Sequence, residues 1–320
     1  MVDQNLESKS KRIPVIAISR KVIQVISFFL INYAALELIF QADFSIIQNI
    51  FKVLPFLHSA QSSWTAGAGL LEYSFYTISQ GQVPYFFIGI IGLLGLFGGK
   101  IFCGWVCPTG FIQDLLYGLG GENKRFSLQV DKALKKVKKF ILIVMIILII
   151  PLAYFKMNNQ ITQTLDYQDF LGALADNTLA PISLSEFLFV TFPGVIQSII
   201  ENINLQALFS EGKAWSTILF IIYIIILVVT VFYPRAYCKY MCPYGAAISY
   251  SAKYSLVKLQ RMPTRCPGRK ECGICEKVCP MQIRILDEEF SGFTGNGECT
   301  LCLDCLEKCP HDAIKFKFGI

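Results

Sequence analysis

The chain has 320 residues and a formal net charge of +6; 54% of its residues are apolar and only 16% are charged. A composition this apolar predicts that much of the chain lies in lipid, and the modest charge gives no support to a nucleic-acid partner. The length suggests about two domains. We expect the first of them to be a membrane domain.

Four stretches are apolar over about the 17–25 residues that a membrane-spanning helix requires. They are residues 22–40, 83–102, 140–155 and 215–234. The third contains Pro151, which a helix packed among neighbours tolerates. The N-terminal segment is too charged, and the first apolar stretch too long, for a cleaved signal peptide. The pattern therefore predicts a mostly α, polytopic membrane protein with four transmembrane helices.

Lysine and arginine are distributed unevenly among the segments that flank these stretches. Five precede the first stretch, eight lie at or after the end of the second, thirteen follow the fourth, and the two remaining loops hold three. The positive-inside rule then places both termini in the cytoplasm, in a multi-pass protein of the inner membrane. We interpret the basic run at 132–139 as a solvated face and Trp215 as an interfacial anchor. Because cytoplasmic thiols stay reduced, we expect no disulfides among the twelve cysteines.

The predicted membrane part is built twice. Each copy has an apolar stretch, a loop, a second apolar stretch and then the motif Cys-x₃-Cys-Pro-x-Gly, which begins at Cys103 and begins again at Cys238. Two crossings per copy give both copies the same orientation, so this is a parallel repeat with both motifs at the cytoplasmic boundary. The two cysteines of a motif, at positions i and i+4, are expected on one face of a helix, which the following Pro108 or Pro243 ends.

Two such helix ends would gather four thiols around one point. They are Cys103, Cys107, Cys238 and Cys242. Four thiolates suit a [4Fe–4S] cluster, zinc or copper(I). The alternatives are redox thiol chemistry and burial as small apolar side chains. The recurrence of one motif at equivalent positions favours a bound metal or cluster.

The last part of the chain carries two further cysteine runs. The second has the pattern Cys-x₂-Cys-x₂-Cys-x₃-Cys-Pro over residues 299–310, the spacing by which bacterial ferredoxins bind a [4Fe–4S] cluster. The first has Cys-x₅-Cys-x₂-Cys-x₃-Cys-Pro over residues 266–280. Together they predict a two-cluster ferredoxin module. A structural zinc ribbon is the alternative that the two prolines and the spacing disfavour.

In two-cluster ferredoxins the fourth cysteine of each run binds the other cluster. The first predicted ligand set is therefore Cys266, Cys272, Cys275 and Cys309. The second is Cys299, Cys302, Cys305 and Cys279. A standard first run would have cysteine at position 269, where this chain has Arg269. Either a longer loop delivers Cys266, or the first cluster lacks a ligand and takes a [3Fe–4S] form.

The sequence lacks the residues that several other cofactors would require. The two histidines, His58 and His311, lie outside the predicted spans, which excludes a bis-histidine haem in the bilayer. No complete Rossmann glycine fingerprint is present, so no nucleotide site is indicated.

The long loops at 42–82 and 157–214 are apolar, which suggests a partner subunit, a lipid-phase quinone, or helices with only a packing role. Glu37, near the outer end of the first stretch, is a candidate proton acceptor for quinol or is merely solvated at the interface.

These patterns divide the chain into three parts: a cytoplasmic segment (1–21), a four-helix membrane domain (22–255) and a cytoplasmic α+β module with two [4Fe–4S] clusters (256–320). From about residue 15 onward, this combination resembles the NapH/MauN membrane ferredoxins. Related architectures occur in NosR of nitrous-oxide respiration and in the CcoG copper reductases. The chain shows neither a flavin domain of the NosR kind nor a further domain after the clusters as in CcoG.

The resemblance implies a subunit that transfers electrons between the quinone pool and a partner oxidoreductase, as a possible quinol dehydrogenase, or that supplies electrons for maturing the partner. The residues lead to a similar hypothesis, because clusters at the cytoplasmic face and four cysteines at the membrane boundary would form one electron path. The alternatives are a copper-binding and copper-reducing protein that uses the four membrane cysteines, and a non-catalytic assembly factor. The sequence determines neither the direction of electron flow nor the partner.

Overall fold

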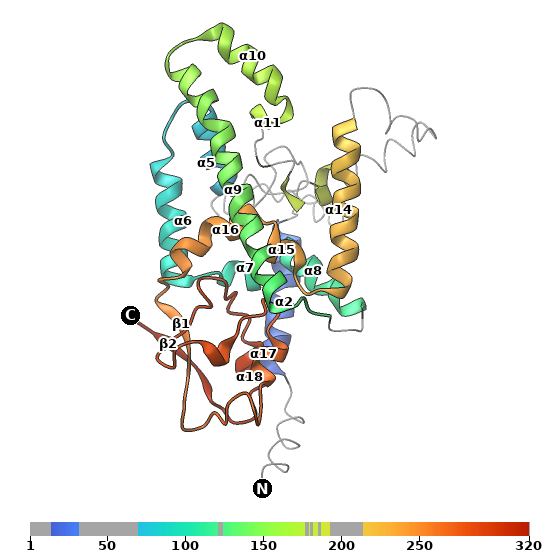
Figure 1. Ribbon diagram of the computed structural model, residues 1–320, viewed down its shortest axis with the longest axis vertical. Coiled ribbons are helices and arrows are strands. Elements are labelled where there is room, and N and C mark those ends of the chain that lie inside the picture. Colours follow the sequence, from blue (N-terminus) through green and yellow to red (C-terminus); the bar gives the residue numbers. More distant parts are fainter. Residues whose placement is uncertain are drawn as a thin grey trace, which may run out of the picture.

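The computed structural model describes residues 14–31, 70–120, 124–176, 179, 182–184, 187–192 and 214–319. Long helices alternate in direction in this part of the chain (Figure 1): α2 (Val15–Ile31) and α9 (Leu128–Met157) lead away from the C-terminal residues, whereas α6 (Tyr85–Gly98) and α14 (Ala214–Phe232) lead toward them. The short helices α10 (Ile161–Leu171) and α11 (Ala173–Asp176) lie near the opposite end, whereas α5 (Leu70–Ser79) packs against α6 and α9, and a π-helical turn (Phe187–Thr191) packs against the middle of α14. The prediction of a mostly helical protein is confirmed.

One helix of the described residues, α9, is long and apolar enough to cross a membrane. It accommodates Pro151 in its interior, as predicted. Helix α6 and the segment Phe220–Phe232 of α14 are apolar but shorter than a span requires, and the first predicted span continues beyond the last described residue of α2. The number of crossings therefore stays a prediction.

The outward faces of these helices are apolar. Phe86 on α6, Ile147 on α9 and Ile225 on α14 are exposed over more than half of their surface, and Ile26 on α2 is similar. A water-soluble domain rarely exposes large apolar side chains on so many neighbouring elements. Contact with lipid, as the sequence predicts, would account for this surface.

Each Cys-x₃-Cys-Pro motif folds as a short helix, a turn and a second helix. The first copy has α7 (Ile101–Trp105) and α8 (Pro108–Leu119), and the second has α15 (Ala236–Tyr240) and α16 (Pro243–Ala252). When the two motifs are aligned on their cysteines, α15 begins and ends at the positions equivalent to those of α7, and α16 begins at the position equivalent to the start of α8. The repeat seen in the sequence is thus repeated in the backbone.

The two cysteines of each motif do not share a helix, contrary to our expectation. Cys107 is the N-cap of α8 with φ −61° and ψ 122°, and Cys242 is the N-cap of α16 with φ −59° and ψ 113°. The residue before a proline avoids the helical region, while proline itself suits the first position of a helix. Pro108 and Pro243 therefore begin the second helix instead of ending the first.

The two copies are interlocked. Helix α8 of the first copy packs against α14 of the second copy and against α2, whereas α16 of the second copy packs against α6 of the first copy and against α9. Figure 1 shows α7, α8, α15 and α16 at the level where the long helices meet the C-terminal residues. This exchange of partners brings the two motifs together.

Residues 257–319 form a small module around a two-stranded antiparallel sheet. Strand β1 (Val257–Arg261) pairs with β2 (Ile314–Phe318) in a register that sets Leu259 opposite Phe316. The chain between the strands forms α17 (Ile274–Val278), a 3₁₀ turn (Ile285–Asp287) and α18 (Asp304–Glu307). Its core combines apolar residues such as Leu259, Ile283 and Phe293 with the buried cysteines. The predicted domain boundary at residue 256 falls between α16 and β1.

Basic side chains of the helical part hold the module in place. Lys138 of α9 is fully buried and contacts Glu298 at 2.5 Å, while Lys100 reaches the same carboxylate at 2.8 Å. Lys135 donates to the carbonyl oxygen of Met281 at 2.8 Å. Our interpretation of the run at 132–139 as a solvated face is therefore wrong for Lys135 and Lys138, because the module covers them.

The module in turn caps the N-terminal end of helix α2. The carboxylate of Glu307 accepts hydrogen bonds from the backbone N–H groups of Ile16 (2.7 Å) and Ala17 (3.1 Å). The first amides of a helix lack partners within the helix, and a negative charge there interacts favourably with the helix dipole. Arg20 adds an ion pair to Asp304 at 2.9 Å.

Candidate cluster-binding sites

The two cysteine runs of the module have the same local backbone. Gly273 and Leu303, which follow Cys272 and Cys302, both have positive φ and precede the short helices α17 and α18. Positive φ is unusual for leucine, so the fold imposes it. Such turns point successive backbone N–H groups into one concavity, where they suit an anionic ligand.

The Cys-Pro ends of the two runs are also alike. The N–H of Ile283 donates to the sulfur of Cys279 at 3.5 Å, and the N–H of Ala313 donates to the sulfur of Cys309 at 3.4 Å. Both contacts close the turn after the proline. Hydrogen bonds of this kind stabilise a thiolate or a cluster-bound sulfur more than a neutral thiol.

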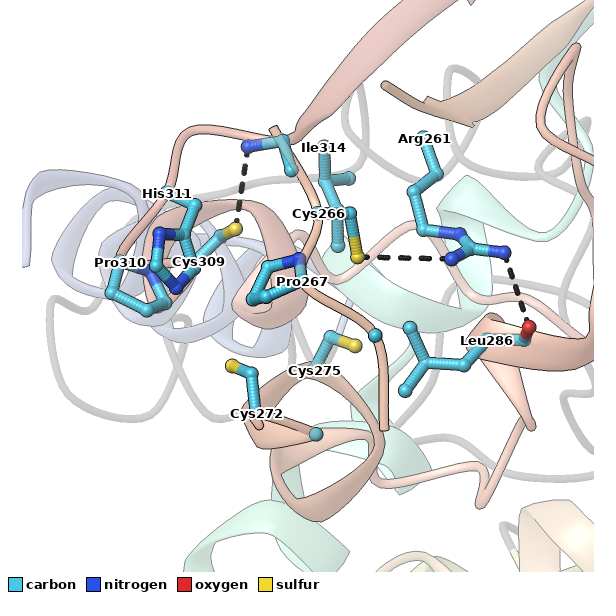
Figure 2. A pocket seen from close by; sticks show the side chains of 13 residues that line it. Arg261, Cys266, Pro267, Cys272, Cys275, Leu286, Cys309, Pro310, His311 and Ile314 are labelled. Carbon is cyan, nitrogen blue, oxygen red and sulfur yellow. Dashed lines mark hydrogen bonds between the residues drawn. The ribbon is translucent and has the colours of Figure 1, made fainter. Parts of the chain in front are cut away.

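A first cavity of about 330 Å³ lies on the outer side of the module. Its lining includes Cys266, Cys272, Cys275 and Cys309. Figure 2 shows the four sulfur atoms arranged around one space, with Cys309 coming from the second run and the others from the first. The structure thus brings the first predicted ligand set together.

A second cavity of the same size, about 330 Å³, lies deeper in the module. Its lining includes Cys279, Cys299, Cys302 and Cys305. This is the second predicted set, with Cys279 contributed by the first run. Each cavity therefore draws three cysteines from one run and the fourth from the other, and four sulfurs around a space of this kind fit a [4Fe–4S] cluster.

The irregular spacing of the first run has a structural explanation. Cys266 lies shortly after β1, and the loop through Pro267 and Gly268, which has φ +88°, leads on to Cys272. The guanidinium of Arg261 approaches the sulfur of Cys266 at 3.7 Å. Arg269 lies at the surface and pairs with Glu276 at 2.8 Å. The longer loop places Cys266 in the cavity, so this set of four sulfurs is complete without a cysteine at 269.

The four cysteines of the two Cys-x₃-Cys-Pro motifs also lie together. Each one of Cys103, Cys107, Cys238 and Cys242 is within electrostatic range of the other members of the group. We call this group the third site. Two of its cysteines come from each copy of the repeat, so it forms only where the copies interlock.

Side chains, rather than turn amides, provide most of the polar contacts at the third site. Gln113 of α8 donates to the sulfur of Cys238 at 3.0 Å, across the boundary between the copies. The hydroxyl of Thr109 lies 3.0 Å from the sulfur of Cys107. The N–H of Gly245 donates to the sulfur of Cys242 at 3.3 Å.

Burial, together with the other cysteines of the group, raises the pKa of the thiols of Cys103 and Cys242 to about 12. Burial has the same effect on the pKa of Cys238. These sulfurs are therefore neutral thiols when nothing is bound. A bound metal centre would supply the positive charge that converts them to thiolates.

A buried hydroxyl supports the fit of a ligand at the third site. Tyr244 is only 3% exposed, and its hydroxyl has no hydrogen-bond partner within the described part of the chain. It lies within electrostatic range of Cys103, Cys107 and Cys242. An unpaired buried hydroxyl costs free energy, and a sulfide or thiolate acceptor would satisfy it.

Sequence reasoning missed this hydroxyl, although a signal was present. Tyr244 and Thr109 occupy the same position, between proline and glycine, in the two motifs. Both carry a hydroxyl group, and both lie beside a cysteine of the third site. Comparison of the two copies residue by residue would have singled out the pair.

Two buried basic residues also occupy equivalent positions. Lys100 and Arg235 each precede the first helix of a motif and are 2% and 1% exposed. Arg235 forms a forked ion pair with Asp114 at 2.7 and 2.5 Å and contacts the carbonyl oxygen of Cys103 at 3.3 Å. Lys100 instead pairs with Glu298, next to a cysteine of the second cavity. In the sequence, Lys100 and Arg235 served only as positive charges that indicate the membrane topology.

The third site and the second cavity are direct neighbours. A Cβ atom at Gly104 would lie 2.3 Å from the carbonyl oxygen of Thr300, so only glycine allows this approach. Thr300 lines the second cavity, and Gly104 follows Cys103. The indole of Trp105 donates to the carbonyl oxygen of Leu301 at 2.8 Å and fixes the contact.

Among the described residues, no three His, Cys, Asp or Glu side chains converge closely enough to hold a single metal ion. The ligands of a cubane cluster bind four separate irons and are necessarily farther apart than the ligands of one ion. His311 borders the first cavity, whereas His58 and the candidate Glu37 lie outside the described residues.

Comparison with known families agrees with this placement. Residues 81–127 and 215–262 each match the family described as a 4Fe-4S binding domain. Residues 265–314 match the family described as a 4Fe-4S dicluster domain. The first family therefore covers both Cys-x₃-Cys-Pro motifs, and the second covers both cysteine runs of the module.

Similar proteins come from several organisms. An uncharacterised protein of Methanocaldococcus jannaschii is 29% identical over 78% of this chain and 85% of its own length. The Escherichia coli protein YccM, whose name refers to electron transport, is 28% identical over 77% of this chain and 60% of its own length. The methylamine utilization ferredoxin-type protein MauN of Paracoccus denitrificans is 25% identical over 65% of this chain and 60% of its own length. No solved structure matches the chain.

The fold and these matches define an iron–sulfur protein of the [4Fe–4S] ferredoxin type. More particularly, the chain is similar to the ferredoxin-type protein MauN and to the electron-transport protein YccM, and the resemblance first seen in its motifs is confirmed.

Proposed function

We propose that the chain conducts electrons between a cytoplasmic redox partner and the membrane, through the first cavity, the second cavity and the third site in that order. The eight module cysteines would hold two [4Fe–4S] clusters and the four motif cysteines a third, and such clusters accept and release single electrons. The protein supplies the thiolates, excludes water from the buried cavities and fixes their sequence in space.

The contact between Gly104 and Thr300 carries this proposal. It joins the wall of the second cavity to the helix that bears Cys103, with no layer of side chains between the two backbones. A module that served only as a soluble carrier would gain nothing from so close an approach to the helical part. The match of both Cys-x₃-Cys-Pro stretches to a 4Fe-4S binding family supports a cluster at the third site.

The membrane end of this path favours a quinone as the lipid-phase carrier. The third site lies at the level where the long helices, with their exposed apolar faces, meet the module (Figure 1). A carrier that moves within the bilayer would reach that level along the apolar faces of the helices. The basic segments on the module side favour a cytoplasmic module and a multi-pass topology with both termini inside.

The test is the iron and acid-labile sulfide content of anaerobically purified protein, together with electron paramagnetic resonance. Three clusters require about twelve irons per chain and two require about eight. The Cys238→Ser variant is expected to lose the third signal and to keep the two module signals. With quinol as the donor, reduction of its module clusters should be slow. Unchanged kinetics in this variant would contradict the electron path.

The same measurements separate the alternatives. About eight irons, with copper(I) that copurifies and disappears in the Cys103→Ser variant, would indicate copper handling at the third site. Clusters that react with neither quinol nor any soluble reductant would indicate an assembly factor.

A further inference from the structure

An open groove of about 1230 Å³ lies between the start of α9 and the first cysteine run of the module. Its charged lining residues are Arg125, Arg269, Lys270, Lys277, Arg284 and Glu276. Five of these six side chains are basic, and four of those five lie on the module, which matches a cluster-binding family. The groove is separate from the second cavity and the third site, and it shares Cys272 and Gly273 with the first cavity.

Much of this positive charge is not neutralised within the described residues. Arg269 and Arg284 share Asp287, each at 2.7 Å, and Arg269 also pairs with Glu276. Among the described residues, Arg125 donates to the uncharged main-chain carbonyl oxygens of Glu276 and Lys277 and forms no ion pair. The remaining lysines, Lys270 and Lys277, are exposed and have no ion pair in the part of the chain that the structure describes.

The groove reaches a candidate cluster ligand. Cys272 lines both the groove and the first cysteine cavity, and the adjoining Gly273, which has φ +116°, lines both as well. With no side chain on Gly273, the backbone is the only cover at that point. Figure 2 shows Cys272 and Cys275 close together on the wall of the first cavity, at the start of α17. An electron carrier seated in the groove would therefore stand against the first cluster.

We propose that this groove docks an acidic electron-transfer protein, which exchanges single electrons with the first cluster at Cys272. The inference rests on the proposed function and names the chemistry of its soluble partner. In each encounter one electron leaves the reduced centre of one protein and arrives at the oxidised centre of the other. No proton or bond is transferred.

Charge and position favour a protein partner over anionic lipid. Four of the five basic residues belong to the module, and Lys270 adjoins the irregular loop of the first run instead of the membrane helices. A lipid headgroup transfers no electrons, so a redox centre in the wall of its binding site would have no function there. Carboxylates on a protein surface would meet the unpaired lysines, and complementary charge speeds such encounters.

The test is a stopped-flow measurement with full-length protein in nanodiscs of neutral lipid and a reduced acidic flavodoxin as donor. Flavin absorbance distinguishes the donor from the clusters. The double variant Lys270→Glu/Lys277→Glu is expected to lower the second-order rate constant about tenfold at low salt and to abolish its decrease with added salt. The matched control, Lys315→Glu/Lys317→Glu on β2, makes the same change of charge away from the groove and should retain most of the rate.

Equal rates in the two double variants would overturn the proposal. The measurement is repeated with anionic lipid in the nanodiscs. A groove variant that reacts normally with flavodoxin, but whose rate no longer depends on anionic lipid as the wild-type rate does, would assign the groove to lipid instead. Reduction by quinol enters at the third site and should be the same in both variants. Failure of the quinol reaction in the wild type, with the salt-dependent flavodoxin reaction intact, would contradict the proposed function while leaving the docking groove in place.

Discussion

The module cavities and the third site each gather four cysteines, but they are built differently. The module takes all eight of its cysteines from one short stretch of chain, and turns of the backbone supply the N–H donors. The third site joins two segments that lie far apart in the sequence and relies on side chains, among them Gln113, Thr109 and Tyr244. Local chain geometry makes the first kind of site. Helix packing and buried ion pairs make the second.

This contrast predicts that the third site is the more sensitive to substitutions distant from its cysteines. Although burial alone raises the pKa of Asp114, the charge and hydrogen bonds of Arg235 outweigh burial and hold it below its ordinary value. Arg235→Met would leave that carboxylate without its ion pair and with only the hydrogen bond from Gln24 at 3.1 Å, at a cost of about 3 kcal/mol in the free energy of unfolding. We expect loss of the third-site iron, measured by iron analysis, with the module signals retained.

Two variants control this experiment. Arg265→Met removes an exposed arginine and should change neither stability nor iron content. The double variant Arg235→Met/Asp114→Leu removes both charges, so it should recover part of the lost stability. If Arg235→Met alone retained all of its iron and stability, the dependence of the third site on buried ion pairs would be disproved.

A smaller effect is expected where the two regions join. The carboxylate of Glu298 accepts hydrogen bonds from both Lys100 and Lys138. The Glu298→Gln substitution would leave these two buried lysines without a negatively charged partner. We expect a loss of about 2 kcal/mol, measured as a lower midpoint of thermal unfolding. Glu289→Gln, at an exposed position, is the matched control and should have no effect.

The same carboxylate gives a pH dependence. Burial raises the pKa of Glu298, but the two lysines outweigh burial and hold it below its ordinary value of 4.5. A lowered folded-state pKa stabilises the protein above the unfolded value, and this contribution disappears as the pH falls through the folded one. The wild type should therefore lose stability in acid more steeply than Glu298→Gln; parallel curves would contradict this assignment.

A third prediction concerns the irregular first run of the module. Cys266→Ser is expected to convert the first cluster to a [3Fe–4S] form, with the loss of about one iron per chain and a new electron paramagnetic resonance signal of the oxidised protein. The backbone turns of the module should hold the rest of the site. If Cys266→Ser left the iron content and spectrum unchanged, Cys266 would not be a ligand.

The smallest effect is expected from the hydroxyl of Tyr244. Tyr244→Phe would remove the hydrogen bond that this hydroxyl would donate to the proposed third cluster, which should remove about 1 kcal/mol from the reduced state and lower its potential by about 40 mV. A redox titration followed by electron paramagnetic resonance measures the shift. Tyr250→Phe, at an exposed position, is the control. A potential equal to that of the wild type would mean that the hydroxyl points elsewhere.

The sequence by itself determined the parts of this protein whose geometry is local. Cysteine spacing followed by proline was enough to predict both module ligand sets, because the turns that deliver those sulfurs are made by the residues between them. For the irregular loop before Cys272 the sequence left two alternatives open, and the position of Cys266 in the lining of the cavity agrees with the one in which a longer loop delivers it. The recurring Cys-x₃-Cys-Pro motif also revealed the internal repeat, and apolar composition revealed the helix α9.

Only the tertiary structure decided what depends on distant contacts. In the sequence, the lysines at 135 and 138 and the residues Lys100 and Arg235 are only basic flanks of apolar stretches, yet in the fold they are covered partners of carboxylates and carbonyl groups. Charge patterns along a chain cannot show which side chains a second domain will cover. The exchange of helices between the copies, which assembles the third site, is likewise a property of packing, since each motif alone presents only two sulfurs.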